Sequence, residues 1–451
     1  MASLPGLLIE GAASVATLAG GLRRGPAQGD AAVLAPPDDR GLYVAAWEGE
    51  ILAVGPAEDV LPRLLGLGLT LNEFRRVDAR GCLVTPGLID AHTHLVFAGA
   101  REAEWQMRLR GASYLEVLQA GGGILSTVAA TRAADSAALL EAARARLGEM
   151  LENGTTTAEA KSGYGLDVAT ELRILDVIGR LADEGPLELV ATFLGAHAVP
   201  PEFREAGAGG TAGAGAAGPD ATERYVASVI ADQLPRVAEQ GIARFCDVFC
   251  EAGVFTAAQT AQILEAAARL GLSLRVHADE LAPSGGAELA AKLGCLSADH
   301  LAAPSDAGVE ALAAAATSDR PVVATLLPAT SWFMGRHHFA PARRYVDAGI
   351  PVALATDLNP GTSPTVSLPL VMSIACLEMG LTPSEALVAV TINAAGSLGL
   401  DGRLGSIEPA RQADLVVWNV PSVDQLPYWL GAHPARVVVK RGRVVLDRSW
   451  A

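Results

Sequence analysis

Residues 86–101 read PGLIDAHTHLVFAGAR, an apolar run that ends in two histidines two positions apart. The chain has only 8 histidines in 451 residues, so this pair stands out. Side chains two apart on a strand point the same way, and His92 and His94 would therefore project together from the end of a buried strand. That arrangement favours metal binding over the alternative, two histidines that donate to nearby carbonyls in a loop.

Short apolar segments alternate with alanine- and leucine-rich amphipathic segments from about residue 83 onward. This alternation is the signature of parallel strands joined by helices. The sequence predicts strands at residues 82–91, 154–161, 187–196, 243–250, 272–278, 295–301, 321–328 and 351–357. Eight alternations favour an α/β fold of the TIM type, a (β/α)₈ barrel, over an open doubly wound sheet. Capping-box spacing at residues 256–259 and 382–385 marks two of the helix starts.

The two ends of the chain differ in kind from the middle. GLYVAAWEGEILAVG near the start, and ADLVVWN and VVVKRGRVVLD near the end, read as strands, the last with a hairpin turn at Arg441 and Gly442. We therefore expect a small composite β-sandwich domain, built from residues 1–81 and 404–451, beside a barrel of residues 82–403. The glycine- and alanine-rich stretch at 206–220 is expected to be a surface loop inserted after the third strand.

Charge and cysteine content exclude several classes of function. The chain has 34 basic and 50 acidic residues and a formal net charge of -16, so neither nucleic acid nor an anionic membrane is an expected partner. Its 5 cysteines, an odd number spread thinly, are typical of reduced thiols, and the N-terminal residues lack the basic region of a signal peptide. No apolar run approaches the ~20 residues that span a bilayer. We expect a cytoplasmic protein.

Other strand ends carry further candidate ligands, and the active sites of such barrels lie at the C-terminal ends of the strands. Those residues are His197, His277, His300 and Asp357. Neutral imidazoles with one carboxylate suit a single zinc or iron(II) ion that keeps open positions for water. The predicted ligands are His92, His94, His277 and Asp357. For Asp357 an alternative stays open, because D-x-N-P-G is also good turn chemistry.

A hydrolytic metal site also needs a base and an acid. A divalent ion lowers the pKa of water, and a nearby side chain must accept the proton and return it to the leaving nitrogen. Glu280, three residues after His277, can reach back over the metal, and His300 could orient or relay the proton. The sequence leaves open whether Glu280, His300 or Asp357 is the essential base. For Glu280 the alternative is a solvated loop acid.

Three predicted loops can recognise substrate. Arg101, just beyond the His-x-His pair, offers a permanently charged, two-pronged clamp for a carboxylate. KSGYG at residues 161–165 and NPGT at residues 359–362 would supply a phenol, backbone amides and a hydroxyl. Turns that simply need glycine, and a solvated arginine, are the alternatives. The cationic clamp predicts a small anionic substrate with an amide or amidine.

Several longer motifs resemble the imidazolonepropionases, a family of metal-dependent amidohydrolases. The resemblance runs from residue 85 to about 400 and includes PGLIDAHTHLVFAGAR, KSGYGLD, FLGAHAVPPEF, HADE and ATDLNPGT. His-x-His marks the wider superfamily only, whereas KSGYGLD and LGAHA-PPEF are far more specific. The glycine- and alanine-rich insertion departs from the family pattern, and residues 1–80 match it only loosely.

This resemblance implies an activity and a role for each matching residue. The reaction would be hydrolysis of the ring amide C–N bond of 4-imidazolone-5-propanoate to N-formimidoyl-L-glutamate, in histidine catabolism. One zinc or iron ion would be held by His92, His94, His277 and Asp357, with Glu280 and His300 as the water-activating pair. The substrate would contact Arg101, Tyr164, His197, Glu280, Asn359, Gly361 and Thr362. A homodimer is the family-like expectation.

Two other functions compete with this one. A deaminase of the same superfamily would use the same His-x-x-Glu pattern after strand five, and its release of ammonia would distinguish it. A non-catalytic barrel that serves as a scaffold belongs to a different class. Such a protein could afford to lose metal ligands, whereas this chain retains the full candidate set.

Overall fold

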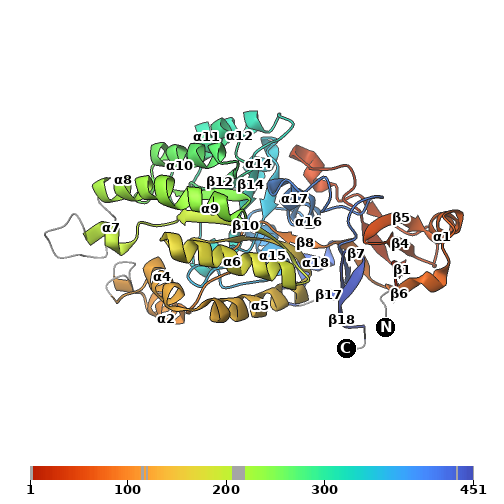
Figure 1. Cartoon of the computed structure of the whole chain (residues 1–451). Coiled ribbons are helices and arrows are strands. Elements are labelled where there is room, and N and C mark those ends of the chain that lie inside the picture. Colours follow the sequence, from red (N-terminus) through yellow and green to blue (C-terminus); the bar gives the residue numbers. More distant parts are fainter. Residues whose placement is uncertain (1–3, 113–115, 118–119, 206–218, 433–434, 450–451) are drawn as a thin grey trace.

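The computed structural model of the chain describes residues 4–112, 116–117, 120–205, 219–432 and 435–449. Within them the chain forms an eight-stranded parallel sheet, wrapped by helices, and two further sheets at one end of the molecule (Figure 1). The predicted surface loop at 206–220 falls almost wholly outside the described residues. Among the described residues, no helix has the length and apolar character needed to cross a membrane.

The eight strands of the large sheet pair in chain order, each parallel to the next. They are β8 (Leu88–Asp90), β9 (Thr155–Lys161), β10 (Glu188–Ala196), β11 (Phe245–Cys250), β12 (Ser273–Ala278), β13 (Ser297–His300), β14 (Val323–Leu326) and β15 (Val352–Leu354). Nearly every strand residue is buried, because helices cover the outer face and side chains fill the interior. The predicted (β/α)₈ barrel is confirmed.

The sheet closes between its first and last strands just beyond their ends. Thr93 and Leu358 form an isolated parallel bridge. Below it the Asp90 carboxylate accepts hydrogen bonds from the Thr356 amide, 3.0 Å, and the Thr356 hydroxyl, 2.6 Å. Between these contacts and the bridge, the Asp357 amide donates to the His92 carbonyl over 3.0 Å. This seam brings Asp357 of strand eight beside the His-x-His pair of strand one.

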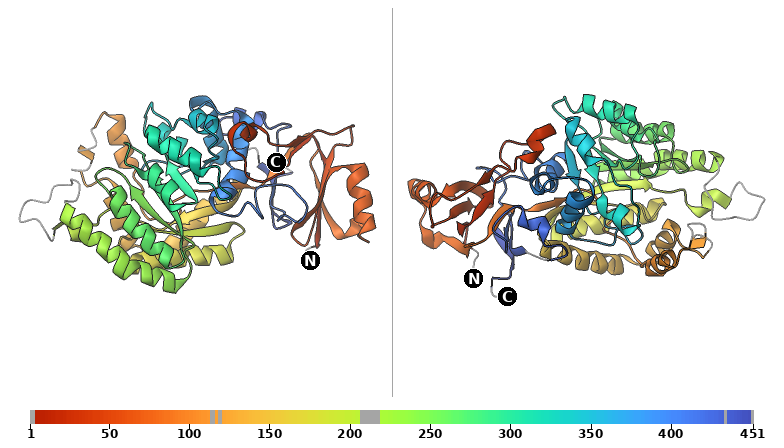
Figure 2. Two further views of the ribbon diagram at one scale, coloured as in Figure 1. Left: turned by 90° about the horizontal axis from the view of Figure 1, so that it is seen from above. Right: turned by 180° about the vertical axis from the view of Figure 1, so that it is seen from behind.

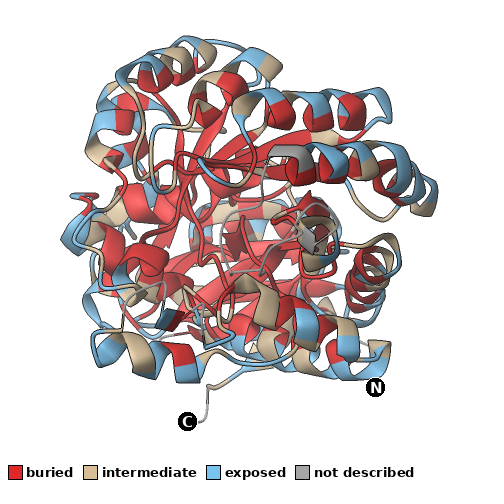
Figure 3. Cartoon of the chain, turned by 90° about the vertical axis from the view of Figure 1, so that its left-hand side faces the viewer, coloured by how far each residue is buried: buried red, intermediate tan, exposed pale blue. Residues whose placement is uncertain are grey.

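Helices ring the barrel with their apolar faces inward. Figure 3 shows buried strands in the middle and helices around them whose outer faces are exposed. The helices of this part are α2 (Glu102–Leu109), α4 (Ile124–Ala133), α5 (Ser136–Glu152), α6 (Val168–Glu184), α7 (Pro201–Glu205), α8 (Pro219–Ser228), α9 (Leu234–Gln240), α10 (Ala257–Arg269), α11 (Gly286–Leu293), α12 (Asp306–Ala315), α13 (Pro328–Phe333), α14 (Ala342–Asp347), α15 (Leu368–Glu378), α16 (Pro383–Ala389), α17 (Ile392–Ser397) and α18 (Gln425–Tyr428). The two predicted capping boxes, which begin at Thr256 and Thr382, are both present.

The two smaller sheets form the predicted composite β-sandwich. One contains β5 (Glu50–Pro56), β4 (Leu42–Trp47), β1 (Gly6–Ala12) and β6 (Phe74–Asp78). The other contains β18 (Arg443–Asp447), β17 (Ala435–Lys440), β16 (Leu415–Trp418), β7 (Leu83–Pro86), β2 (Ser14–Ala16) and β3 (Val33–Leu34). One apolar core joins them, with Leu7 and Val44 on one side and Val417 and Val437 on the other. The remaining N-terminal elements are α1 (Ala57–Gly66) and the short helices at Gly25–Gly29 and Leu71–Glu73.

Both chain ends lie at this end of the molecule (Figure 2). The hairpin predicted at Arg441 and Gly442 joins β17 to β18, and both turn residues have positive φ, 49° and 71°. Positive φ at two successive positions is the geometry of a tight hairpin turn.

The first predicted strand is wrong in one respect, because residues 82–91 form two strands instead of one. β7 pairs with β16 and β2 of the sandwich, and only β8 belongs to the barrel. The chain changes sheets at Gly87, where a Cβ atom would lie 2.2 Å from the Thr156 hydroxyl oxygen. No side chain fits there, so this crossing requires glycine. The division into residues 1–81 with 404–451, and 82–403, remains a proposal, with β7 as the strand that links the two parts.

Candidate metal centre and active site

The four predicted metal ligands meet inside the C-terminal mouth of the barrel. Asp357 Oδ1 lies 3.5 Å from Nε2 of His92 and 3.5 Å from Nε2 of His94. The His277 ring, from β12, has its centroid 4.5 Å from that of His92. Ligand atoms of His92, His94 and His277 lie within 4.8 Å of one another, and so do those of His92, His300 and Asp357. Strands one, five, six and eight thus contribute to one cluster.

The donor set fits a divalent cation. His92 Nε2, His94 Nδ1 and His277 Nε2 are buried and have no hydrogen-bond partner within the described part of the chain. Burial holds the pKa of His92 and His94 well below the usual range, so both rings are neutral. A neutral imidazole nitrogen has the lone pair that a metal requires. Burial also raises the pKa of Asp357, an effect that a bound cation would oppose.

Asp357 is oriented toward the histidines instead of capping its own turn. Its Oδ2 accepts a hydrogen bond from the Thr330 hydroxyl at 2.6 Å, which leaves Oδ1 toward the rings. The residue has a φ of 52°, and His300 at the end of β13 has a φ of 73°. Left-handed backbone at non-glycine residues is strained and gathers at functional sites. The direction of the carboxylate supports the ligand interpretation of Asp357 over the turn alternative.

Beneath these ligands lies a layer of charged side chains that the sequence analysis missed. His92 Nδ1 is 2.6 Å from Asp299 Oδ2, and His277 Nδ1 is 3.0 Å from Asp247 Oδ2. Lys161 Nζ donates to Asp247 over 2.7 Å. Burial opposes ionisation of Asp247, but His277 and Lys161 outweigh it and hold the pKa of this carboxyl far below its usual range. Charged residues inside otherwise apolar strands were the available signal.

Glu280 and His300 form a second acid–base pair at the rim of the cluster. Glu280 Oε2 lies 3.8 Å from His300 Nδ1, and Oε1 accepts a hydrogen bond from Arg336 at 3.1 Å. Burial alone would raise the pKa of Glu280, but the charges of His300 and Arg336 outweigh it and hold that pKa below its usual range. All three residues line one small pocket with Thr330. Arg336 is a further residue that the sequence analysis missed.

Arg101 reaches the loop after strand eight while paired with an acid of its own helix. Glu104 accepts two hydrogen bonds, from Nε and Nη2 of Arg101, both 2.8 Å. A Cβ atom on Gly361 would lie 1.9 Å from Arg101 Nη1, so the guanidinium rests directly on the glycine backbone. The pairing leaves Nη1 toward Gly361. Glu104 was not predicted, although its i,i+3 spacing from Arg101 was visible in the sequence.

Tyr164 and His197 lie against the predicted ligands. The His197 ring stacks on His94 with centroids 4.8 Å apart and planes 14° apart, and the Tyr164 centroid is 5.7 Å from that of His94. Burial lowers the pKa of His197 to about 3, so its ring is neutral at neutral pH. Its Nδ1 is 3.0 Å from the Gly163 carbonyl, which can only accept, and therefore carries the ring proton.

The NPGT segment is a turn built around Asn359. Its side-chain oxygen accepts hydrogen bonds from the amides of Gly361, 2.9 Å, and Thr362, 2.8 Å, while its amide group donates to the Asp357 carbonyl over 2.7 Å. The segment is therefore a turn, as the alternative in the sequence analysis expected, and its role in substrate binding stays a prediction. Arg101 rests on Gly361, the residue before Thr362.

Sequence comparisons agree with this geometry. A family model described as the amidohydrolase family matches residues 83–445. The imidazolonepropionase of Geobacillus kaustophilus is 50% identical over 399 residues, which is 88% of each chain. That of Symbiobacterium thermophilum is 47% identical over 444 residues, 98% of each chain. The chain belongs to the imidazolonepropionase family. Like the other imidazolonepropionases it is an amidohydrolase, a hydrolase that acts on C–N bonds.

Comparison of structures extends the fold beyond the imidazolonepropionases. An adenosine deaminase from Xanthomonas campestris, solved with bound zinc, matches with a TM-score of 0.68 and 20% sequence identity, over 98% of this chain and 93% of that one. At such low identity the match establishes the shared fold alone.

Proposed function

We propose that this protein hydrolyses the ring amide C–N bond of 4-imidazolone-5-propanoate to N-formimidoyl-L-glutamate, in histidine catabolism, with one divalent ion. The observation that carries the proposal is the contact of Asp357 Oδ1 with both rings of the His-x-His pair, next to Glu280 and His300. This cluster occurs on a chain 50% identical to an imidazolonepropionase.

The residues that would hold the ion are His92, His94, His277 and Asp357. When bound, such an ion lowers the pKa of water and polarises an amide carbonyl. Zinc and iron both accept three imidazoles and one carboxylate, so either metal suits this donor set.

Glu280 and His300 would move the protons of the reaction. Water adds across the ring amide, so that its oxygen joins the carbonyl carbon and a proton joins the ring nitrogen that leaves. Glu280 would accept the proton from water, and His300, 3.8 Å from it, would orient the reacting groups or pass the proton on. Arg336 keeps the Glu280 carboxylate ionised and directed at this rim. Asp357 is the weaker candidate for the base, because Thr330 and the two histidines occupy its oxygens.

Arg101 and Thr362 would bind the propionate. Glu104 occupies Nε and Nη2 of Arg101, which leaves Nη1 on the side of the Gly361–Thr362 loop. A carboxylate between Nη1 and the Thr362 hydroxyl would gain charge-assisted hydrogen bonds. The substrate ring would be surrounded by five further residues, which are Tyr164, His197, Asn359, Gly361 and Glu280.

The test is a spectrophotometric assay on freshly prepared 4-imidazolone-5-propanoate, with metal content and ammonia measured on the same sample. We expect loss of the ultraviolet absorbance of the ring, no ammonia, and bound zinc or iron. Ammonia from an aromatic amidine substrate would instead support the deaminase alternative. Protein that lacks both metals and stays inactive after refilling would support the scaffold. Glu280→Gln should lower kcat by about 10²–10⁴-fold while the metal content stays the same.

We also propose that the protein acts as a homodimer in the cytoplasm. Leu377 of α15 and Tyr428 of α18, two helices in contact with each other, are each 74% exposed, and the exposed Trp429 and Leu430 follow Tyr428 directly. Exposed apolar patches of this kind are typical of protein interfaces. All five cysteines are free, as in a reducing compartment. Sedimentation analysis of the wild type and of Trp429→Ser should show a dimer and a weakened dimer, whereas a wild-type monomer would contradict this proposal.

A further inference from the structure

Lys161 occupies the centre of the charged layer beneath the candidate metal ligands. It ends strand β9 and is fully buried. Its Nζ lies 2.7 Å from Asp247 Oδ2, 2.8 Å from Glu159 Oε1 and 3.7 Å from Asp299 Oδ2. One ammonium thus contacts carboxylates from three different places in the barrel wall.

Two of these carboxylates continue to histidines of the candidate metal centre. Asp299 Oδ2 contacts Nδ1 of His92 at 2.6 Å, and Asp247 Oδ2 contacts Nδ1 of His277 at 3.0 Å. The Asp299 carboxylate accepts the Nδ1 proton of His92 and so leaves the Nε2 lone pair of that ring free for a cation, while Asp247 lies within ion-pair distance of the His277 ring. The Nε2 atoms of both rings are buried and lack a hydrogen-bond partner among the described residues.

A lysine is suited to this position in a way that an arginine is not. The sequence contains only three lysines among its 34 basic residues, at positions 161, 292 and 440. An ammonium is a compact point charge with three donors that can face three acceptors in different directions, whereas a guanidinium is a planar fork. The Asp299 carboxylate is shared with such a fork, because Arg275 Nη2 also donates to Asp299 Oδ2, over 3.0 Å.

We propose that Lys161 is a positioning residue of the metal centre, which fixes His92 and His277 together through Asp299 and Asp247. Removal of the ammonium leaves two like-charged aspartates near each other with one cation fewer between them. Both aspartates would then move, and with them two ligands from different strands. The inference rests on the proposed metal site and goes beyond it, since the ion-pair partners of Lys161 among the described residues are carboxylates outside the predicted ligand set.

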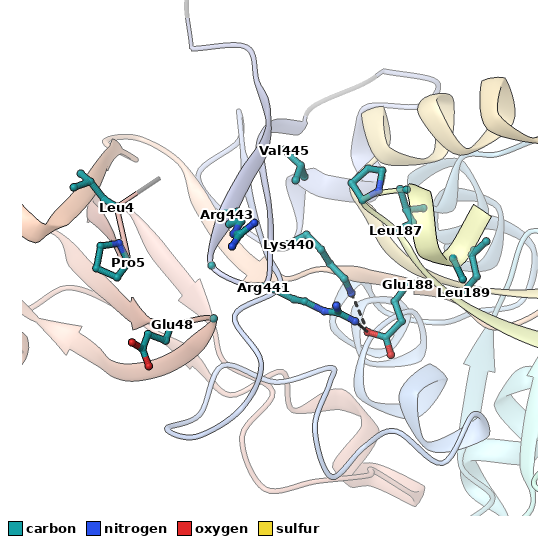
Figure 4. A pocket seen from close by; sticks show the side chains of 15 residues that line it. Leu4, Pro5, Glu48, Leu187, Glu188, Leu189, Lys440, Arg441, Arg443 and Val445 are labelled. Carbon is teal, nitrogen blue, oxygen red and sulfur yellow. Dashed lines mark hydrogen bonds and ion pairs between the residues drawn. The ribbon is translucent and has the colours of Figure 1, made fainter. Parts of the chain in front are cut away.

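The chain supplies a matched control at the other end of the barrel. Lys440 is 5% exposed, and its Nζ lies 2.6 Å from Asp414 Oδ2 and 3.3 Å from Glu188 Oε2. Figure 4 shows this lysine and Arg441 directed at Glu188, beside a cleft of about 890 Å³ that contains none of the candidate site residues. Loss of Lys440 therefore removes a buried ammonium between carboxylates without touching a histidine of the metal centre.

The experiment compares Lys161→Met with Lys440→Met in the full-length protein. Zinc affinity is measured by competition with a chelator, and the visible spectrum is recorded with cobalt in place of zinc. We expect Lys161→Met to weaken zinc binding by about 10–100-fold, the usual cost of losing an outer-sphere partner, and to change the cobalt spectrum. Lys440→Met should keep the zinc affinity and cobalt spectrum of the wild type, although both variants should melt at lower temperature.

Further variants separate the possible failures. If Lys161→Met does not fold, Asp299→Asn and Asp247→Asn each loosen one histidine, and each should weaken zinc binding while keeping the shape of the side chain. Wild-type affinity and spectrum in folded Lys161→Met, or in both asparagine variants, would overturn the inference. His277→Ala tests the metal site itself. If that variant also binds zinc like the wild type, the ligand set is wrong, and not only the role of Lys161.

Discussion

Lys161 and Lys440 are both lysines in nearly the same environment, at opposite ends of the barrel. Both ammonium groups are buried and each has a carboxylate within 2.7 Å. Around Lys440 the carboxylates continue to arginines, because Glu188 also pairs with Arg403 and Arg441. Around Lys161 two of them continue to ring nitrogens, and Asp299 also contacts Arg275.

The comparison shows that burial and pairing of a charge do not by themselves reveal its use. Moving both partners of an ion pair out of water costs desolvation free energy, and their mutual attraction roughly offsets that cost. At the end of the barrel that faces the β-sandwich, called the floor here, the Lys440 network joins the sandwich to the barrel, since Lys440 ends β17 and Glu188 begins β10. At the C-terminal mouth of the barrel, the Lys161 network orients side chains. What the carboxylates contact next distinguishes the two.

The largest effect should come from His277→Ala, which removes a predicted metal ligand and its contact with Asp247 in the Lys161 network. We expect the protein to fold, to lose its zinc or iron during purification, and to have no detectable activity on 4-imidazolone-5-propanoate. Metal analysis and the spectrophotometric assay measure both. The network around Lys440 should be untouched, but the metal-free variant should be less stable than the metal-free wild type, because it loses a buried ring that contacts Asp247. A fully active variant would place the metal elsewhere.

The same contrast explains which parts of the site could be predicted from the sequence. His92, His94, His277 and Asp357 come at strand ends, and strand ends of a parallel barrel share one face, so their convergence follows from the count of strands. Lys161 and its partners could not be paired in advance. Which interior side chains meet depends on how the sheet closes at the Thr93–Leu358 seam, a long-range property that no local pattern contains.

Local patterns were reliable for turns and caps and failed where two sheets meet. The hairpin at Arg441 and the capping box at Thr382 depend on residues within a few positions, and both are present. The apolar run 82–91 reads as one strand, yet β7 and β8 belong to different sheets. Only the contact of Gly87 with Thr156, from a strand some seventy positions away, divides it. Glu104 and Arg336 were missed because isolated charges usually lie in solvent.

The next largest effect should come from a change in the network around Lys440 and Glu188, and it should appear in how the free energy of unfolding depends on acidic pH. Burial would raise the pKa of Glu188, but Arg403 and Lys440 outweigh it and lower the pKa from 4.5 to about 2. A lowered pKa in the folded protein stabilises it above the unfolded pKa, and that stability is lost as pH falls from 4.5 toward 2. The shift corresponds to about 3 kcal/mol at neutral pH. Glu188→Gln should therefore be destabilised at pH 7, and the difference from wild type should shrink below pH 4.

Urea unfolding at pH 7, 4 and 3 measures this difference. Metal content and kcat/KM should stay at wild-type values, because Glu188 lies far from the mouth. If the difference in unfolding free energy between wild type and Glu188→Gln is the same at all three pH values, the charge of Glu188 does not stabilise this end of the barrel. Loss of metal in Glu188→Gln would mean that the two ends are coupled, and would break the comparison.

A smaller effect should follow from Arg101→Gln, which removes the proposed clamp but leaves both lysine networks in place. Charge-assisted hydrogen bonds contribute roughly 1.5–3 kcal/mol, so kcat/KM should fall by about 10–100-fold, mainly through KM. Exposed Arg110, at the other end of α2, gives the matched control, Arg110→Gln, which should behave like wild type. An imidazolone without the propionate should be turned over equally by wild type and Arg101→Gln. Unchanged kcat/KM on the full substrate would exclude the clamp.

The smallest effect should be a shift in pH dependence caused by Arg336→Gln. Arg336 and His300 hold the pKa of Glu280 low, so loss of the guanidinium should raise it. A base works only when ionised, and activity falls as pH drops through its pKa, so the acidic limb of kcat/KM should move to higher pH. The Arg336 side chain is 32% exposed and partly screened by water, which limits the shift to less than about one pH unit. Arg344, which pairs with Asp306 on the surface, supplies the control Arg344→Gln with no shift. An acidic limb that stays in place in Arg336→Gln would show that the titrating base is not Glu280, and would assign the proton transfer to His300 or to Asp357.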